Sequence, residues 1–161
     1  MTLPRFGFAT AYLFASLHLI APATASAQAG AAQRVSGAFT LIMTPAAPPQ
    51  HAGRTQTGRM LLDKQYLGEL AASGNGEMLS AVTDTKGSAA YVAIERVSGT
   101  LKGKTGSFVL QHTGSMRAGA QQLSISIVPD SGTGQLEGIT GTMAIRMVGG
   151  DHSYDLDYVL R

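Results

Sequence analysis

The chain contains no cysteine in its 161 residues. Without thiols it can form no disulfide, no thiolate metal site and no cysteine nucleophile, and it has no cysteine that could carry a lipid anchor. Long segments with helical periodicity are absent as well. The fold must therefore be stabilised by its apolar core alone, and strands are favoured over helices.

Charge is scarce and nearly balanced. The sequence has 12 Lys and Arg residues against 10 Asp and Glu, a formal net charge of +2. This balance creates no continuous basic field, and no basic stripe accompanies the aromatic residues. We therefore expect no nucleic-acid partner.

Recognisable catalytic motifs are also missing. There is no G-x-S-x-G elbow and no phosphate-binding glycine loop. Asp151, His152 and Ser153 are the residue types of a hydrolase triad, but consecutive residues cannot adopt its geometry. His51 and His112 are too far from each other and from His152 in sequence to suggest a metal site. We predict no metal and no cofactor, and we favour a binding protein over an enzyme.

Residues 1–27 have the three parts of a secretory signal peptide. Arg5 supplies the positive charge, residues 6–20 form an apolar segment, and Ala25-Ser26-Ala27 is a small-x-small cleavage site. The apolar segment is shorter than the ~20 residues that span a bilayer. We expect cleavage before Gln28 and export to the periplasm or the extracellular space, with no membrane span afterwards.

The remaining length fits one domain. Removing 27 of the 161 residues leaves 134, enough for a single core and too few for two. We expect residues 28–34 to be a flexible N-terminus and residues 35–161 to form one domain.

The distribution of glycine and of alternating apolar residues predicts an all-β domain. Glycine is about twice as frequent as the ~7% of average composition, which suits tight turns. We expect a turn at Gly74-Asn75-Gly76 and a bulge or corner at Gly68. Eight segments read as strands at spacings near ten residues, which favours a sandwich or a closed barrel. They are residues 35–44, 59–66 with 69–72 beyond the expected corner at Gly68, 77–82, 91–101, 105–116, 123–127, 142–147 and 154–158.

A ten-residue pattern occurs twice. Residues 99–108 and 134–143 both read G-x-L-x-G-x-x-G-x-apolar. The pattern predicts a hairpin in which glycines carry the bends and an apolar residue enters the core on each side. We interpret it as a structural device.

Three segments resemble a known family. They are GRMLLDKQYLGELAASGNGEML, GSAAYVAIERVSGTLKGKTGSFVLQHTGSM and VPDSGTGQLEGITGTM, and the resemblance to the bacterial domain-of-unknown-function family DUF3224 extends over about residues 35–160. That family is similar in fold to the allene oxide cyclase barrel. The resemblance implies a single, closed, antiparallel eight-stranded β-barrel of calycin-like form with a central cavity. It implies no established activity, and only SGTGQLEGITG resembles a cyclase segment, so no cyclase site residue is carried over.

Glu95 is the most informative polar residue, because it follows an apolar run. Alternation places it on one strand face with Tyr91, Ala93 and Val97. If this face lines the barrel, burial would raise the pKa of Glu95 and suit it to proton transfer or to holding a polar ligand group. If the face points outward, Glu95 is a solvated surface residue.

The partner of Glu95 depends on the hairpin register. A two-residue tip at residues 103–104 would pair Glu95 with His112, and a three-residue tip at residues 102–104 would pair it with Gln111. An inward His112 would more often be a satisfied core histidine than a catalytic one. The candidate ligand-binding residues are therefore Tyr91, Glu95, Gln111 and His112. By contrast, we expect the other strand charges to face water: Asp63, Lys64, Glu69 and Glu77.

These observations favour an exported barrel that binds a small apolar molecule. Methionines would give a soft, adaptable interior, with Glu95 fixing one polar group of the ligand. The methionines we expect inside are Met43, Met60, Met78, Met143 and Met147. The alternatives are an isomerase-like or cyclase-like enzyme with a buried Glu95, supported by fold analogy only, and a filled barrel that acts through its surface. The sequence leaves the oligomeric state open.

Overall fold

The computed structural model describes residues 30–161, so the predicted signal peptide lies outside the described residues. Within residues 30–161, no helix is long and apolar enough to cross a membrane. The strands are β1 (Gln33–Pro45), β2 (Gln50–Ala52), β3 (Thr55–Gly68), β4 (Leu70–Thr83), β5 (Ala89–Leu101), β6 (Lys104–Arg117), β7 (Ala120–Ile127), β8 (Thr133–Gly134), β9 (Thr140–Val148) and β10 (Asp151–Val159).

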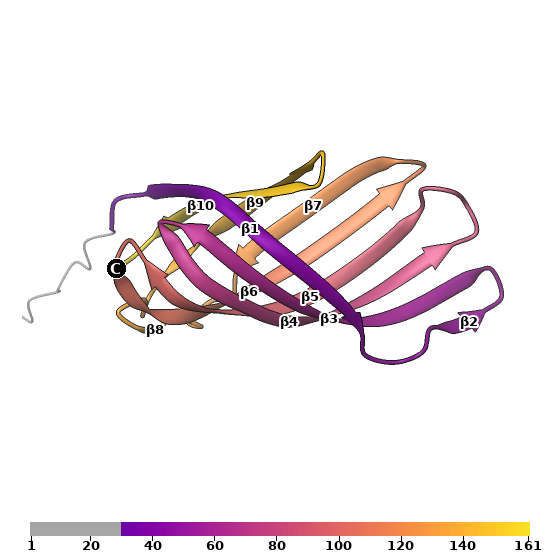
Figure 1. Cartoon of the computed structure of the whole chain (residues 1–161), viewed down its shortest axis with the longest axis horizontal. Coiled ribbons are helices and arrows are strands. Elements are labelled where there is room, and N and C mark those ends of the chain that lie inside the picture. The colour runs from indigo at the N-terminus through magenta and orange to yellow at the C-terminus, as the bar shows by residue number, and fades with distance from the viewer. Residues whose placement is uncertain (1–29) are drawn as a thin grey trace, which may run out of the picture.

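Eight of these strands form a closed antiparallel barrel, which confirms the predicted fold class. Their order is β1-β10-β9-β7-β6-β5-β4-β3, and β3 pairs back with β1. The short strands β2 and β8 lie outside this circuit, paired with β3 and β6. The strands run obliquely to the long axis, with β2 near one end of the molecule and β8 near the other (Figure 1).

The two ends of the barrel differ. At the end near β8, the segment between β7 and β9 folds under the barrel and buries Leu136 and Ile139. This closed end is filled by apolar side chains. At the opposite end lie the turns between β4 and β5, between β6 and β7 and between β9 and β10 (Figure 1), and we call this end the mouth of the barrel.

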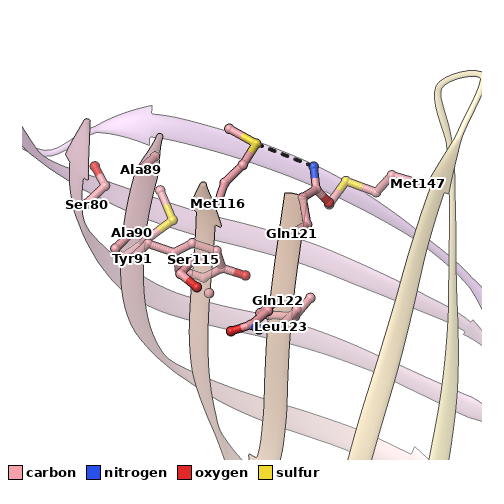
Figure 2. Close-up of a pocket in the computed structure, with 12 residues that line it drawn as sticks. Ser80, Ala89, Ala90, Tyr91, Ser115, Met116, Gln121, Gln122, Leu123 and Met147 are labelled. Atoms are coloured by element: carbon pink, nitrogen blue, oxygen red, sulfur yellow. Dashed lines mark hydrogen bonds between the residues drawn. The ribbon is translucent and has the colours of Figure 1, made fainter. Parts of the chain in front are cut away.

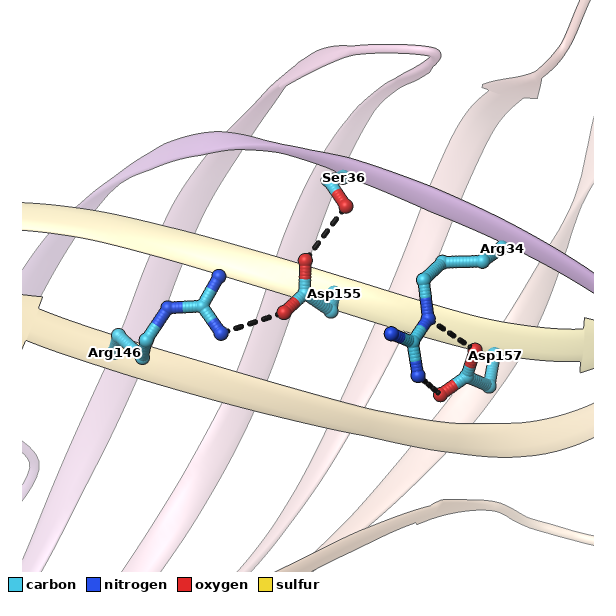
Figure 3. A network of polar contacts seen from close by, with 5 residues as sticks. All are labelled: Arg34, Ser36, Arg146, Asp155 and Asp157. Atoms are coloured by element: carbon cyan, nitrogen blue, oxygen red, sulfur yellow. Dashed lines mark hydrogen bonds and ion pairs between the residues drawn. The ribbon is translucent and has the colours of Figure 1, made fainter.

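Ion pairs on the outer surface join the strands that complete the circuit. The Arg34 guanidinium of β1 donates two hydrogen bonds of 2.5 and 2.6 Å to Asp157 of β10. Asp155 accepts one from Ser36 and one from Arg146 of β9, both 2.6 Å long (Figure 3). These contacts lie in solvent, so each adds little to the free energy of folding.

The predicted turn at Gly74-Asn75-Gly76 is wrong. Both glycines lie inside β4. The corner predicted at Gly68 is confirmed, because the chain turns there from β3 into β4 with a φ of +106° that favours glycine. A Cβ on Gly74 would overlap the carboxylate of Glu95, which packs against it. These strand glycines are needed for space and not for a turn.

The hairpin between β5 and β6 forms as predicted, but its register differs from both alternatives. Its two-residue tip is Lys102-Gly103, and both residues have positive φ, 49° and 79°. The two predicted tips, residues 103–104 and 102–104, lie slightly further along the chain and would have paired Glu95 with a later residue of β6. The observed tip instead pairs Glu95 with Leu110. His112 therefore lies diagonally across from Glu95 on the same face.

The repeated glycine pattern forms a hairpin only in its first copy. In the second copy, Gly134 belongs to β8, which pairs with β6, and the chain then turns into β9. The leucines of the two copies, Leu101 and Leu136, are nevertheless both buried. What the copies share is the burial of an apolar residue between glycines.

Candidate functional site

Glu95 points into the barrel, where its side chain is fully buried at 0% exposure. Lys64 Nζ donates a hydrogen bond of 2.6 Å to Glu95 Oε2, and the Tyr66 hydroxyl donates one of 2.8 Å to Oε1. His112 Nε2 lies 3.1 Å from Oε2 but is not aligned as a hydrogen bond. Lys64 and His112 are themselves only 4% and 2% exposed. We call these four residues the buried quartet.

Gly74 allows Glu95 to reach Lys64 and Tyr66 across an intervening strand. Lys64 and Tyr66 belong to β3 and Glu95 to β5, with β4 between them. The carboxylate reaches over Gly74, which stands directly opposite Lys64 and carries no side chain to obstruct it. A larger residue at this position would separate the ion pair.

The contacts within the quartet determine the ionisation of Glu95. Burial raises the pKa of this carboxyl, but the nearby His112, Lys64 and Tyr66 outweigh burial and leave the pKa below its usual value. Of the two orientations that the sequence left open, Glu95 adopts the inward one, but the rise in pKa expected for that orientation does not occur. Burial and the neighbouring carboxylate raise the pKa of Tyr66, which stays protonated and acts as a donor.

Lys64 has further partners in the barrel interior. Its ammonium lies 5.3 Å from the centre of the Phe39 ring and 5.7 Å from that of Tyr66. Phe39 in turn stacks on His152 at a centroid distance of 5.1 Å. The cation is thus enclosed by a carboxylate and two aromatic faces, a suitable environment for a desolvated lysine.

A separate pocket of about 260 Å³ opens at the mouth of the barrel. Its inner wall is formed by residues that face one another across neighbouring strands. Tyr91 of β5 is paired with Ser80 of β4 and with Gly114 of β6, and Gly114 is paired in turn with Leu123 of β7. The Tyr91 ring packs against Gly114, where a Cβ would overlap it. Figure 2 shows the lining residues, which are Met78, Ser80, Ala89, Ala90, Tyr91, Gly114, Ser115, Met116, Gln121, Gln122, Leu123 and Met147.

The mouth pocket and the buried quartet are adjacent but not continuous. His112 stands opposite Ala93, one inward-facing position below Tyr91 and Gly114. Neither Glu95 nor His112 lines the pocket. Glu95 is instead saturated by donors from its own barrel, which suits it to hold the interior together and not to accept a proton from a ligand.

The four candidate residues predicted from the sequence therefore lie in three different places. Tyr91 lines the mouth pocket, and Glu95 and His112 lie together in the quartet. Gln111 is exposed on the outer face of β6, away from all three. The alternative contact between Glu95 and Gln111 does not occur, because Glu95 stands opposite Leu110, and Gln111, the next residue, points to the other face of the strand.

Sequence reasoning missed two members of the quartet. Lys64 was expected to face water, and Tyr66 was not singled out. The alternation of Leu62, Lys64 and Tyr66, all buried, with exposed residues between them is the signal that identifies this inward face. It is weak because Leu61 and Leu67 on the outer face are apolar too.

The five methionines expected in the interior lie in different environments. Met43 is 50% exposed, so the expectation is wrong for this residue, and Met60 is half-buried in β3. Met78 and Met147 line the mouth pocket, and Met116 joins them although it was not predicted. Met143 is buried in the core, where the Tyr66 hydroxyl lies 3.9 Å from its sulfur.

Two broader hollows lie on the outer surface over β3 to β6, with volumes of about 720 and 780 Å³. Leu79 and Val92 line both hollows, and Ile94 lines one of them. These three side chains face outward and are largely exposed. Within residues 30–161, no cluster of His, Asp or Glu has the arrangement of a metal site.

Comparisons with known proteins identify a family and a shared fold. The family model described as protein of unknown function (DUF3224) matches residues 35–158. A crystal structure of a protein with unknown function from the DUF3224 family of Shewanella oneidensis MR-1 is 46% identical, with a TM-score of 0.77 over 81% of this chain and 99% of that one. No curated protein matches the chain. The chain therefore belongs to the DUF3224 family.

Proposed function

We propose that this protein binds a small apolar molecule in the mouth pocket of its barrel. The observation that supports this function is the pocket itself, an apolar hollow of about 260 Å³ at the one end of the barrel that side chains do not fill. Concave apolar sites with a few polar groups are the usual form of ligand pockets. At the closed end, Leu136 and Ile139 occupy the corresponding space.

The composition of the pocket wall suits an apolar ligand. Met78, Met116 and Met147 present flexible thioether side chains, which adapt to irregular apolar shapes. Leu123 and the face of Tyr91 complete the apolar wall. At the pocket, Leu123 and Met147 are 42% and 60% exposed, so a ligand would remove apolar surface from water there.

Glu95 has a structural role in this proposal. Its carboxylate already accepts hydrogen bonds from Lys64 and Tyr66, and the pocket does not reach it. An isomerase or cyclase reaction would require Glu95 to contact the substrate. Binding is therefore the better-supported function.

The test is binding of N-phenyl-1-naphthylamine, a neutral apolar dye that fluoresces when desolvated. We expect saturable binding by the protein and loss of binding in Met78→Trp, which fills the pocket. The matched control is Leu79→Trp, because Leu79 is the next residue but points outward. Absence of saturable binding, or equal binding by both variants, would overturn the proposed function.

We also propose that residues 1–27 direct export of the protein. The support is the charged start, apolar segment and small-x-small site of that stretch. N-terminal sequencing of the protein isolated from its own cells should begin at Gln28. A start at Met1 in protein recovered from the cytoplasm would contradict export.

A further inference from the structure

The polar groups of the mouth pocket specify the kind of ligand, an inference that rests on the proposed function. Among the described residues, no charged side chain lines the pocket. Its polar residues carry amides and hydroxyls: Ser80, Tyr91 and Gln121 stand on inward-facing strand positions, and Ser115 and Gln122 stand on the outward-facing positions between them. Every side chain that could orient a ligand here is therefore neutral.

Gln121 is the best placed of these groups. It lies on the inward face of β7 opposite Met116, at the rim of the pocket. Figure 2 shows its amide between the side chains of Met116 and Met147. Its Nε2 lies 3.8 Å from Met116 Sδ, and a thioether is a weak acceptor.

The amide of Gln121 is consequently available to a ligand. Within residues 30–161, its carbonyl oxygen has no hydrogen-bond partner, and its N–H group has only the weak bond to sulfur. A ligand hydroxyl or amide can accept from this N–H and donate to this carbonyl. A hydrocarbon can do neither.

Tyr91 supplies a second neutral group at the same site. Burial raises the pKa of its phenol, so the hydroxyl remains uncharged at physiological pH. A neutral hydroxyl can both donate and accept a hydrogen bond.

A charged head group has no counter-ion in this pocket. The buried cation beneath it, Lys64, is committed to Glu95 at 2.6 Å. Near the mouth, Lys86 lies in the turn between β4 and β5 and Arg117 points outward at the end of β6, and neither lines the pocket. A carboxylate or an ammonium entering the pocket would lose water without gaining an opposite charge, which is costly.

We propose that the ligand is an uncharged amphiphile, an apolar body with one hydroxyl or amide group that hydrogen-bonds Gln121. The pocket volume of about 260 Å³ is below the range typical of drug-sized ligands, so the apolar body is small. A medium-chain alcohol has this combination of size, apolar surface and neutral head group. The corresponding fatty acid has the same chain but carries a negative charge, for which the pocket offers no cationic side chain.

The experiment compares three probes of equal chain length at pH 7.5: 1-decanol, decanoate and decylammonium. Each is titrated against the full mature protein loaded with N-phenyl-1-naphthylamine. We expect 1-decanol to displace the dye at least about tenfold more effectively than either ion, because only the ions would give up hydration on entering the pocket without meeting an opposite charge. Equal displacement by decanoate would overturn the neutral-ligand inference and leave apolar binding intact. Failure of the dye itself to bind would overturn the proposed function instead.

Two variants test the role of Gln121. Gln121→Leu should weaken 1-decanol binding with little effect on the dye, and Gln121→Glu should improve decylammonium relative to 1-decanol. Gln111→Leu is the matched control, since Gln111 is exposed on the outer face of β6 and lies outside the pocket. Unchanged 1-decanol binding in Gln121→Leu, or an equal loss in Gln111→Leu, would overturn the assignment of Gln121.

Discussion

The buried ion pair between Lys64 and Glu95 is the residue-scale feature on which the barrel interior depends. Both side chains are removed from water, and their N–O distance is 2.6 Å. Taking a charge out of water is expensive unless its partner is present. The structure therefore predicts strong coupling between these two positions.

We expect Glu95→Leu alone to destabilise the protein by about 3–5 kcal/mol, because it leaves Lys64 buried without a counter-ion. The double variant Lys64→Met and Glu95→Leu should recover much of this loss, since it leaves no uncompensated charge. Urea denaturation of the wild type, both single variants and the double variant gives the coupling free energy. Additive losses would show that the two charges do not interact as the geometry requires.

The same carboxyl predicts how stability depends on pH. Its pKa is lowered in the folded state, so unfolded chains bind the proton first, and the stabilisation is present above the unfolded value of about 4.3. This stabilisation is lost as pH falls from there through the folded pKa. Urea denaturation between pH 7 and pH 3 should show a fall in wild-type stability below about pH 4.5 and a shallower fall in Glu95→Gln. Asp157→Asn is the control, because Asp157 forms its ion pair on the surface and should alter the profile little.

At the scale of elements, the hairpin between β5 and β6 holds one residue, Lys102, in a backbone conformation that its residue type disfavours. Its tip places Lys102 at a φ of +49°, a conformation that asparagine adopts more readily than lysine. Gly103 follows with a φ of +79°, so the tip has the form in which Asn-Gly is preferred.

We therefore expect Lys102→Asn to stabilise the protein by about 0.5–1 kcal/mol, measured by thermal and urea denaturation. The substitution also removes the contact of 3.8 Å between Lys102 Nζ and Glu69, which is exposed and of little energetic weight. Glu69→Gln removes that contact alone and should leave stability nearly unchanged. A loss of stability in Lys102→Asn would contradict the argument from backbone conformation.

The elements also show what the sequence could predict. Strict alternation in Leu123, Ile125 and Ile127 identified a half-buried strand, and the positions of most strands follow from such patterns. Gly74 was misplaced because a glycine that makes room for a distant carboxylate looks, in sequence, like a glycine that makes a turn. The difference is set by Glu95 on another strand, so no local pattern contains it.

Only part of the candidate site could be predicted, again because its contacts are formed between distant strands. The inward direction of Glu95 was one of two open alternatives, and its contact with His112 was foreseen from a register that the structure does not adopt. Lys64 was missed because a lone lysine in a strand usually faces water. Its burial depends on the carboxylate that meets it, a tertiary contact between β3 and β5 across β4.

At the scale of the whole molecule, the barrel is asymmetric along its axis. One end is closed by the segment that carries Leu136 and Ile139, and the other is open and rich in methionine. The circuit of strands is closed, but β7 and β9 are joined by a single bridge, Ser126 with Thr142, so their segments toward the mouth are not hydrogen-bonded to each other. The barrel interior is accessible at this open end.

This asymmetry predicts the order in which methionines are oxidised. Met147 and Met43 are 60% and 50% exposed, whereas Met143 is 4% exposed. Mild hydrogen peroxide treatment followed by peptide mass spectrometry should find sulfoxide first at Met147 and Met43 and last at Met143, because oxidation follows access. Comparable rates at Met143 would mean that the barrel interior is open to solvent.

Adding N-phenyl-1-naphthylamine makes the oxidation experiment a test of where the ligand lies. Met147 lines the mouth pocket and Met43 does not, although the two are similarly exposed. A bound ligand should therefore slow the oxidation of Met147 and leave that of Met43 unchanged. Equal protection of both residues would place the dye elsewhere or indicate a general stabilisation of the fold, and protection confined to Met147 ties binding to the open end of the barrel.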